Sequence, residues 1–600
     1  MKRAVLALAV MALSLAACSG DGRVAATASD PSQWSAVDAL GRTIDPDDYP
    51  APRADRQVGI FYFLWLGCHG YDTPANGNDV AMPTDADTLS PFDNSRLTRQ
   101  NPDYPDFGPR TAMHHWSEPH FGYYLSDDEW VMRRHAQLLG DAGVDVVFFD
   151  VTNGYTYLPI VERLCTVYED IRSKGGRTPQ VAFILNSNPA PTLAAIYDGF
   201  YKPRRHADLW YEWEGKPLIL VPEDAATDEQ RDFFTIRRAW FASHPAAEGE
   251  WFGDGRDRWT WGDYYPQQAG WHTSPDKPEQ ISILPATHPH TLHGRSHDGV
   301  RQPEAADCDS GRGIYFAKQM ERALEVDPRF VFITGWNEWT AQRQVFPAGM
   351  DIPNSYQRPE GTTFFVDQFT EEFSRDIEPM RGGFGDNYYY QMADFIRRYK
   401  GATPVPVRSR RHTLRIDGRF GDRRGAEAVY DDYEGDTSPR DARGWGRIGR
   451  YTNDSGRNDI VRTWVCSDKE KIYFSVRCAR PITAPAEQWM MLFIATRGDG
   501  PRWEGFDYAV NRRTGMLERS EGGWRWTAET EAEYAVDGCD MELALPLKAL
   551  GIDDPDDFTV DFKWIDNACA EGDITECMDR GDAAPDARYK YRYKFKNRQL

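Results

Sequence analysis

The stretch FITGWNEW, residues 332–339, contains the residue types that a carbohydrate-cleaving site would need. It is an apolar run that ends in Trp336, Asn337, Glu338 and Trp339. The carboxyl group of Glu338 could transfer a proton, and the tryptophan rings could stack on the apolar faces of a sugar. The alternative is a strand end whose polar residues face water. We take Glu338 as the first candidate catalytic residue.

Glycoside hydrolysis ordinarily requires two carboxyl groups, so Glu338 needs a partner. We favour Asp150, which ends the continuously apolar run VDVVFFD. Burial beside aromatic residues would raise the pKa of this carboxyl group and suit it to donate a proton. The alternative role for Asp150 is to cap the next helix or to accept backbone hydrogen bonds. Asp263, Glu118 and Glu223 remain candidates for the second carboxylate.

Polar and aromatic residues follow most of the other apolar runs and form a set of candidate substrate-binding residues. Histidine, amide and carboxylate groups could bind sugar hydroxyls, and the alternative for each aromatic ring or histidine is packing in the core. The predicted set is Trp65, His69, His115, Trp116, Glu118, Asn186, Glu223, Asp263, His288, Trp336, Asn337 and Trp339. The segment HPHTLHGRSH is rich in histidine, but no spaced carboxylates or cysteines accompany it, so we predict no metal site there.

Strand-like and helix-like patterns alternate before residue 400, which is the order of a (β/α)8 barrel. Arg237, Arg238 and Arg258 interrupt the fifth and sixth strands, so these two are the weakest predictions. The predicted strands are 58–65, 144–150, 180–186, 217–221, 233–240, 258–261, 281–286 and 330–336. Active sites of such barrels lie at the carboxyl ends of the strands, where the candidate residues fall.

Helices and a linker complete this first domain, which we place at residues 51–400. The helical pattern over 126–143 predicts Ser126 as its N-cap, with Glu129 three residues later. Residues 310–328 read as another helix, and DNYYYQMADFIRRY supplies the last one. The proline-containing stretch GATPVPVRSRR, residues 401–411, then reads as a linker to a second domain.

Three blocks of this first domain resemble the glycoside hydrolase family 99 and WbsX-like group. They are VFITGWNEW, FYFLWLGCHG near the start, and HHWSEPHFGYY with the helix and strand that follow it. The likeness extends over residues 55–400 and implies a barrel that cleaves glycosidic bonds. In that family a W-N-E-W-x-E element carries two glutamates. The first falls on Glu338, but the second falls on Ala341, so half of the family's pair is missing here.

Residues 412–600 consist of short strands with polar turns, which predicts an all-β sandwich. Their order resembles family-9 carbohydrate-binding modules and the related DOMON-like sandwiches. This resemblance implies an accessory sugar-binding domain, although Arg423 stands where the family often has tryptophan. Some such modules hold calcium, for which Asp566, Asp573 and Asp582 are candidates, whereas acidic loops are often merely solvated. We predict no other cofactor.

The N-terminus predicts secretion. Residues 1–17 have a basic start, a short apolar stretch and small residues before Cys18, as a bacterial lipoprotein signal does. LSLAAC resembles a lipobox, which implies lipidation of Cys18, and the polar residues after it suit a tether over 18–50. The net charge of -23 argues against nucleic acid as the main partner. Cys569 and Cys577 are close enough in the sequence to form a disulfide.

Together these features predict a glycoside hydrolase that acts on an extracellular polysaccharide or glycan. It would be lipid-anchored to the bacterial cell envelope through Cys18, at the outer membrane and either periplasmic or surface-exposed. The alternative is a glycan-binding lipoprotein on a catalytically silent barrel, which Ala341 favours. A glycosyltransferase role is disfavoured because the chain has no phosphate-cradling glycine loop.

Overall fold

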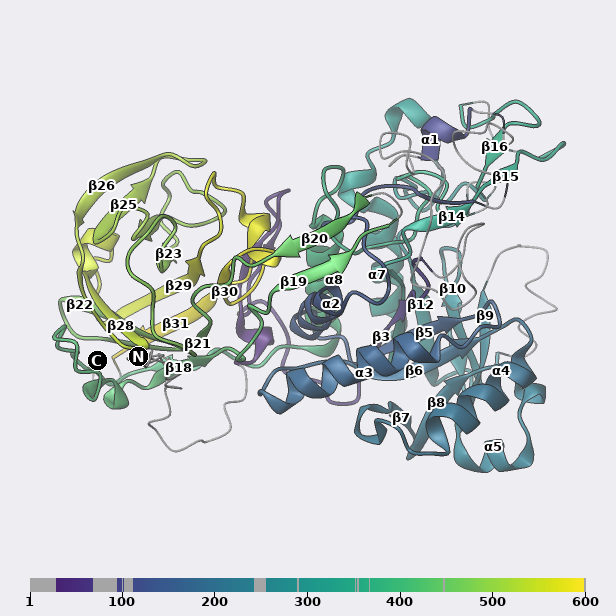
Figure 1. Cartoon of the computed structure of the whole chain (residues 1–600), viewed down its shortest axis with the longest axis horizontal. Helices are drawn as coiled ribbons and strands as arrows, with labels where there is room; N and C mark the ends of the chain where they lie inside the picture. Colours follow the sequence, from purple (N-terminus) through teal and green to yellow (C-terminus); the bar gives the residue numbers. More distant parts are fainter. Residues whose placement is uncertain are drawn as a thin grey trace, which may run out of the picture.

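Two domains follow each other along the chain, and Figure 1 shows the helix-containing domain beside a domain made of β-sheets. The computed structural model describes residues 29–67, 94–99, 101, 110, 112–241, 255–288, 291–350, 352, 355–365, 367–445 and 448–597. Cys18 and His69, which the sequence marks as a lipidation site and a site residue, lie outside the described residues.

The first domain is built on a parallel sheet curved into a barrel. Its strands are β3 (Gln57–Tyr62), β5 (Val146–Val151), β6 (Gln180–Leu185), β8 (Lys216–Leu220), β9 (Thr235–Phe241), β10 (Arg258–Gly262), β12 (Pro278–Ile283) and β13 (Phe330–Trp336). They pair in the order β10-β9-β8-β6-β5-β3-β13-β12, and every neighbouring pair is parallel. The Gln280 side chain joins the two ends, because it accepts from the Thr260 amide at 3.0 Å and donates to its carbonyl at 2.7 Å. The predicted barrel is confirmed.

Arg237 in the fifth strand is accommodated by a buried carboxylate. Arg237 of β9 forms an ion pair with Glu279 of β12 at 2.7 Å, and both side chains are buried. The indole N–H groups of Trp213 and Trp259 also donate to Glu279, at 3.0 and 2.8 Å. A buried guanidinium with such a partner does not interrupt a strand, since its charge and its hydrogen bonds are satisfied.

Helices cover the outside of this barrel. The main ones are α2 (Glu129–Ala142), α3 (Leu158–Ser173), α4 (Pro189–Ile196), α5 (Asp228–Phe233), α7 (Ile314–Val326) and α8 (Asn387–Lys400). The N-cap of α2 is Asp128, whose carboxylate accepts from the amides of Trp130 and Val131, and not Ser126 as predicted. The Ser126 hydroxyl instead accepts from the Leu66 amide at 2.8 Å, so it fixes the segment that follows β3.

Shorter elements complete the domain. They are η1 (Pro31–Gln33), β1 (Ala36–Val37), β2 (Thr43–Ile44), α1 (Asn94–Leu97), β4 (Met113–His115), η3 (Tyr197–Tyr201), η4 (Ala207–Leu209), β7 (Glu212–Trp213), η5 (Glu223–Ala225), β11 (Gly270–Trp271), η8 (Ala305–Asp307), η9 (Ser310–Arg312), β14 (Thr340–Gln342), β15 (Gln344–Val345) and β16 (Thr363–Phe364). In the part of the chain that the structure describes, no helix has the length and apolar character needed to cross a bilayer.

The second domain is a largely antiparallel β-structure of two main sheets. One is 8-stranded and contains β17 (Val407–Arg408), β23 (Met491–Ala495), β24 (Tyr508–Val510), β25 (Met516–Ser520), β26 (Trp526–Glu531), β29 (Asp557–Asp566), β30 (Asp582–Ala584) and β31 (Tyr591–Lys596). The other is 5-stranded and contains β18 (Ala428–Asp431), β21 (Ile460–Ser467), β22 (Lys471–Cys478), β27 (Glu533–Asp537) and β28 (Asp540–Pro546). Phe474 of β22 packs on Phe562 of β29 with ring centroids 5.2 Å apart, so the sheets share one core.

The remaining elements of this domain are the strands β19 (Arg440–Arg443) and β20 (Arg450–Asn453) and the short helices η10 (Asp422–Gly425), η12 (Leu547–Leu550) and η13 (Ile574–Met578). β19 and β20 form a separate hairpin, which Figure 1 shows reaching from the second domain toward the barrel helices. Arg440 of this hairpin pairs with the N-cap carboxylate of Asp128 at 2.7 Å, and both side chains are buried.

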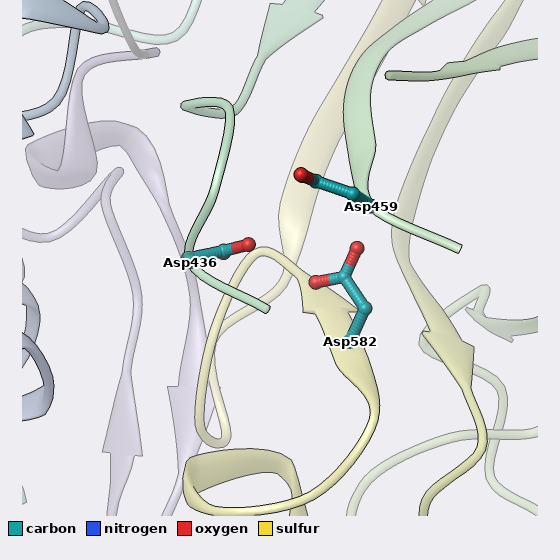
Figure 2. A group of neighbouring side chains, drawn as sticks. All are labelled: Asp436, Asp459 and Asp582. Atoms are coloured by element: carbon teal, nitrogen blue, oxygen red, sulfur yellow. The ribbon is translucent and has the colours of Figure 1, made fainter. Parts of the chain in front are cut away.

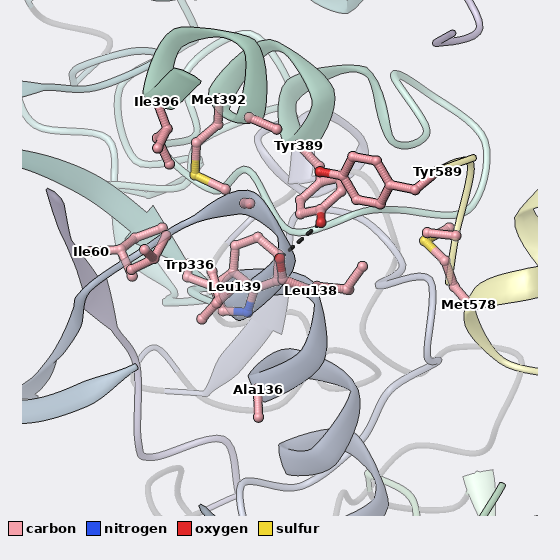
Figure 3. Packing of buried hydrophobic residues seen from close by; sticks show 14 of the residues in the cluster. Ile60, Ala136, Leu138, Leu139, Trp336, Tyr389, Met392, Ile396, Met578 and Tyr589 are labelled. Atoms are coloured by element: carbon pink, nitrogen blue, oxygen red, sulfur yellow. Dashed lines mark hydrogen bonds between the residues drawn. The ribbon is translucent and has the colours of Figure 1, made fainter. Parts of the chain in front are cut away.

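A continuous apolar core also joins the domains. Figure 3 shows Leu138, Trp336 and Tyr389 of the barrel near Met578 and Tyr589 of the second domain. Residues from 29 onward, which the sequence analysis assigned to the tether, take part in this packing, since Trp34 is buried against Tyr589 and Tyr591. The two domains therefore form one folded body around α8.

Candidate active site

The end of β13 carries Glu338 to the rim of the barrel. Asn337 adopts a left-handed conformation with φ of 58°, and its side chain makes two hydrogen bonds to Phe63, which follows β3. The Asn337 amide oxygen accepts from the Phe63 N–H at 2.8 Å, and its amide nitrogen donates to the Phe63 carbonyl at 2.9 Å. Asn337 therefore orients the turn that presents Glu338, a positioning role in place of the predicted contact with substrate.

The Glu338 carboxylate lies in a row of charged side chains. The Arg375 guanidinium is 3.3 Å from Glu338 and 3.3 Å from Asp367, and it contacts both through the same Nη2 atom. The Nδ1 atom of His288 is 3.4 Å from the Asp367 carboxylate. We call these four residues the rim group. The Glu338 side chain is 13% exposed, so its carboxyl group is largely buried but still in contact with solvent.

The segment that carries Arg375 is held against the end of β13 by backbone hydrogen bonds. The Gly335 amide donates to the Arg375 carbonyl at 2.8 Å, and the Ile377 amide donates to the Gly335 carbonyl at 3.1 Å. The amide of Glu338 donates to the Asp376 carboxylate. These contacts fix the guanidinium opposite Glu338 although the segment is neither helix nor strand.

The surroundings shift the pKa values of the two carboxyl groups of the rim group in opposite directions. Burial raises the pKa of Glu338 to about 7, and the charges of Asp367 and Asp150 add to the rise against the opposing effect of Arg375. Burial would also raise the pKa of Asp367, but the charges of Arg375 and His288 outweigh it and hold that pKa well below its usual range. At neutral pH Glu338 can therefore hold or release a proton, whereas Asp367 stays ionised.

Asp150 lies at the end of β5 and is near enough to Glu338 for its charge to raise the pKa of Glu338. Its carboxylate accepts from the Trp65 indole N–H at 3.0 Å and from the Thr152 amide and hydroxyl at 3.0 and 2.7 Å. Burial raises the pKa of Asp150 against these hydrogen bonds. Because three donors stabilise its ionised form, Asp150 is better suited to accept a proton, and Glu338 is better suited to donate one.

Three of the four tryptophans predicted as sugar platforms are buried, which corrects that prediction. Trp116, Trp336 and Trp339 have 0% of their surface exposed. Trp116 stacks on Trp339 with centroids 4.7 Å apart, and its indole N–H donates to the Glu338 carbonyl at 3.1 Å. Trp336 packs in the core shown in Figure 3. These rings support the backbone around Glu338, and Trp65 is the one of the four that keeps exposed surface.

The remaining predicted residues are distributed around the rim and the core. His115 is buried against Tyr123 and Trp445, and burial lowers its pKa to about 3, so its role is in packing. The Asp263 carboxylate accepts from the amides of Tyr264 and Gln268 and so orders the loop after β10.

Glu118 lies 3.7 Å from Arg381, and Asn186 is exposed at the end of β6. Glu223 begins η5, and its side chain lies outside the described residues. The structure therefore brings Glu338, Asp150, Trp65 and His288 of the predicted set to one region, together with Arg375 and Asp367, which were not predicted.

A second polar network lies beneath Glu338 and was also missed. The buried Glu378 carboxylate accepts from the Tyr124 hydroxyl at 2.7 Å and the Trp339 indole at 2.6 Å, and it lies 3.0 Å from Nε2 of His135. Arg375, Asp376 and Glu378 all come from the stretch EEFSRDIE, whose density of charge was the available signal.

Position 341, where the family pattern has its second glutamate, is apolar in its surroundings as well as in its side chain. Ala341 lies on β14 and packs in a cluster with Leu97, Phe346 and Phe365. A carboxylate is thus absent from this position, and Asp150 and Asp367 are carboxyl groups near enough to Glu338 for their charges to raise its pKa.

No model of a protein family matches this chain, and no curated protein matches it. Among solved structures, the chain is similar to the GH99 endo-alpha-mannosidase from Bacteroides thetaiotaomicron, with 14% identity and a TM-score of 0.30. That match covers 58% of this chain and 99% of the mannosidase. The same mannosidase in complex with bis-tris-propane matches with 13% identity and a TM-score of 0.30, over 58% of this chain and 98% of the other. We draw no conclusion about activity from a likeness of this size.

Proposed function

We propose that this protein is a glycoside hydrolase in which Glu338 is the proton donor and Asp150 is the second carboxylate. The observation that carries the proposal is the environment of Glu338. It stands at the carboxyl end of a barrel strand, its side chain is 13% exposed, and its pKa is raised to about 7. A carboxyl group in that state is matched to general acid catalysis at neutral pH.

In this mechanism the protonated Glu338 donates its proton to the glycosidic oxygen as the bond from that oxygen to the anomeric carbon breaks. The departing sugar thus leaves as a neutral alcohol, and positive charge develops on the ring that remains. The carboxylate left on Glu338 gains the Arg375 guanidinium as its counter-ion, 3.3 Å away. Asp150, favoured in its ionised form by three donors, attacks the anomeric carbon or takes a proton from the attacking water.

Asp367 and His288 act through Arg375 in this proposal. Asp367 stays ionised and shares Nη2 of Arg375 with Glu338, so it limits how strongly the guanidinium lowers the pKa of Glu338. They are positioning residues for the proton donor. Trp65 holds Asp150 by its indole N–H and keeps part of its ring exposed, which leaves it as the candidate platform for a sugar ring.

The proposal places the enzyme outside the cytoplasm, anchored to the bacterial cell envelope by a lipid on Cys18. The basic start, the short apolar stretch and the sequence LSLAAC support it. Its substrate would be an external polysaccharide or glycan, with the second domain as an accessory carbohydrate-binding-like module. Arg423, which stands at the position where the resembling family often has tryptophan, is buried in an ion pair with Asp540, so it stabilises this domain and does not offer a sugar-binding ring.

A second candidate function is glycan binding without catalysis. The observation in its favour is the apolar environment of Ala341, which removes the second glutamate of the resembling family. The two functions differ in whether a bound glycan is cut.

The test is release of reducing ends from a panel of polysaccharides by the purified chain and by Glu338→Gln. We expect the wild-type chain to cut at least one polysaccharide and the Glu338→Gln chain to bind the same polysaccharide without cutting it. Asp150→Asn and Asp367→Asn, measured on that substrate, identify the second carboxylate. If a polysaccharide binds equally to both chains and neither cuts it, the binding function replaces the hydrolase.

A further inference from the structure

Three aspartates from separate segments meet at the end of the second domain that faces the barrel. Asp436 lies between β18 and β19, Asp459 directly precedes β21, and Asp582 begins β30. One carboxylate oxygen from each lies within 4.8 Å of the other two. Figure 2 shows the three carboxylates pointing toward a common centre. We call these three residues the aspartate cluster.

The outer oxygens of the aspartate cluster are held by the protein. Asp436 accepts from the Gln137 side chain at 3.4 Å, Asp459 accepts from the Gly435 amide at 3.0 Å, and Asp582 accepts from the Ile460 amide. These bonds orient the carboxylates, so their convergence is built into the fold.

The second oxygen of Asp436 has no such partner. Asp436 is only 4% exposed, yet its Oδ1 atom is buried and accepts no hydrogen bond from any described residue. A buried oxygen without a donor costs about 1–3 kcal/mol, and more when it is charged. The Oδ1 atom of Asp436 is such an oxygen, and its carboxylate points toward the other two aspartates, which favours a positively charged ligand between them.

The charges of Arg134 and Arg480 act on Asp436 and Asp459 from a distance, without an ion pair. Within the described ranges, no lysine, arginine or histidine forms an ion pair with Asp436, Asp459 or Asp582. Arg134 is the nearby guanidinium, and it lies 4.0 Å from Asp586.

We propose that Asp436, Asp459 and Asp582 bind a calcium ion. All the ligand atoms are carboxylate oxygens, which hard divalent cations prefer, whereas structural zinc sites are built mainly from cysteine and histidine. Calcium lies about 2.3–2.6 Å from its oxygen ligands, so an ion at the centre would reach three oxygens spread over up to 4.8 Å. Magnesium requires contacts of about 2.0–2.1 Å in a stricter octahedron, which fits this spread less well.

The site differs from the one expected from the sequence. Of the three predicted calcium ligands, only Asp582 belongs to it. Asp566 is paired with Arg457 at 2.9 Å, and Asp573 accepts from the Thr575 amide at the start of η13. Asp566 and Asp573 therefore already have partners within the protein, and Asp436 and Asp459 are the other two ligands of the proposed site.

Binding of the ion would strengthen the connection between the two domains. Asp436 contacts Gln137 on α2, and Arg440, four residues later, pairs with Asp128 at the start of the same helix. An ion bound by Asp436, Asp459 and Asp582 would tie the loop at the base of the β19–β20 hairpin to β21 and β30. The hairpin that rests on the barrel would then be fixed to the second domain.

The test is calcium titration of the purified full chain after treatment with EDTA, followed by calorimetry and thermal unfolding. We expect about one tightly bound calcium per chain and a rise in Tm of roughly 2 °C at a hundredfold excess over Kd, for a chain of 600 residues that unfolds as one body. Asp436→Asn should weaken calcium binding at least tenfold and lose most of the Tm rise. The matched control is Asp441→Asn on the same hairpin, whose side chain is 70% exposed, and it should respond as the wild type does.

Two results would overturn the proposal. The first is a wild-type chain whose Tm and calorimetric signal do not change with calcium, which would mean that the aspartate cluster is held together by protons. The second is equal calcium binding by the wild-type and Asp436→Asn chains, which would place the ion elsewhere. Asp436→Asn should fold in EDTA, because it removes one of several like charges. If it does not, Asp459→Asn is used with the same expectations. Magnesium binding as tight as calcium binding would overturn the choice of ion.

Discussion

The rim group and the aspartate cluster both collect carboxyl groups in buried surroundings, but within the described residues only the rim group has a cation in ion-pair contact. Arg375 lies 3.3 Å from two carboxylates of the rim group, whereas Asp436, Asp459 and Asp582 form no ion pair within the described residues. A carboxyl group that faces a fixed guanidinium can gain and lose a proton without disturbing the fold, which suits it to catalysis.

Burial alone does not define the function of a carboxyl group. Burial raises the pKa of Glu338 to about 7 and that of Asp459 to about 6, so the two regions resemble each other in this respect. They differ in what lies opposite each carboxyl group. Each of the following experiments alters or probes one of the two regions, and the other region should not be affected.

The largest effect is expected from removing the proton donor. Glu338→Gln should lower kcat/KM by about 10²–10⁴-fold, the range that a general acid contributes. Substrate affinity and the response of Tm to calcium should not change. The matched control is Glu321→Gln on α7, an exposed glutamate paired with Lys318, which should leave the rate unaltered. A rate within threefold of the wild type would remove Glu338 from the mechanism.

Removing the cation of the rim group should make it resemble the aspartate cluster. In Arg375→Met, Glu338 loses the charge that lowers its pKa, so the alkaline limb of the pH–rate profile should move upward from about 7. The rate should also fall by roughly 10²-fold, because the carboxylate formed on Glu338 loses its counter-ion. Arg322→Met on α7 is the control. If the alkaline limb of the pH–rate profile does not move, Arg375 does not set the pKa of the proton donor.

The pH dependence of stability should carry a signature of Glu338. Its pKa is raised from 4.5 to about 7 on folding, so between these values the folded chain binds more protons than the unfolded chain. The contribution of Glu338 to the free energy of unfolding is therefore full below pH 4.5 and is lost as the pH rises to 7, by roughly 3 kcal/mol. Urea unfolding at both pH values should show a loss that is about 3 kcal/mol larger in the wild type than in Glu338→Gln, because Asp459 and the other raised carboxyl groups contribute equally to both chains. If the free energy of unfolding changes by the same amount between the two pH values in both chains, the pKa of Glu338 is not shifted by folding.

The smallest effect is expected from a cysteine pair close to the aspartate cluster in sequence. The Sγ atoms of Cys569 and Cys577 lie 3.5 Å apart in the segment that leads to β30 and Asp582. In an oxidising compartment they should form a disulfide that stabilises the chain by about 2–3 kcal/mol through its short loop. Mass spectrometry of peptides with and without reduction checks the bond. Cys577→Ser should lower Tm and leave the rate unchanged, and a fully reduced pair in secreted protein would contradict the expectation.

The barrel could be predicted because its strands are continuous apolar runs, and each of the eight predicted runs overlaps a barrel strand. Even Arg237 and Arg258 did not hide their strands, since neighbouring apolar residues kept the pattern. The position of Glu338 followed from the rule that strands of such barrels end at the active-site rim. The N-cap of α2 was misplaced because Ser126 and Asp128 are both good capping residues, and only the fold shows that Ser126 is bonded to Leu66.

The partners of Glu338 could not be predicted in the same way. Arg375 and Asp367 come from a segment without helix or strand, where neither periodicity nor a motif marks which charges will meet. The tryptophans beside Glu338 could have been platforms or core residues, because the same ring serves both uses. Their burial depends on Trp116 and Trp339 meeting across 222 residues or more of chain, which no local pattern encodes. The aspartate cluster was likewise assembled from segments far apart in the sequence.

The central claim is that the fold makes Glu338 a carboxyl group that is half protonated near neutral pH. The most direct measurement is an infrared titration of the carboxylic-acid C=O stretch in the wild-type chain, with the spectrum of Glu338→Gln subtracted at each pH. The difference band should disappear as the pH rises, with a midpoint at about pH 7. A midpoint near the ordinary value of 4.5 would contradict it, because Glu338 would then be ionised at neutral pH and could not be the proton donor.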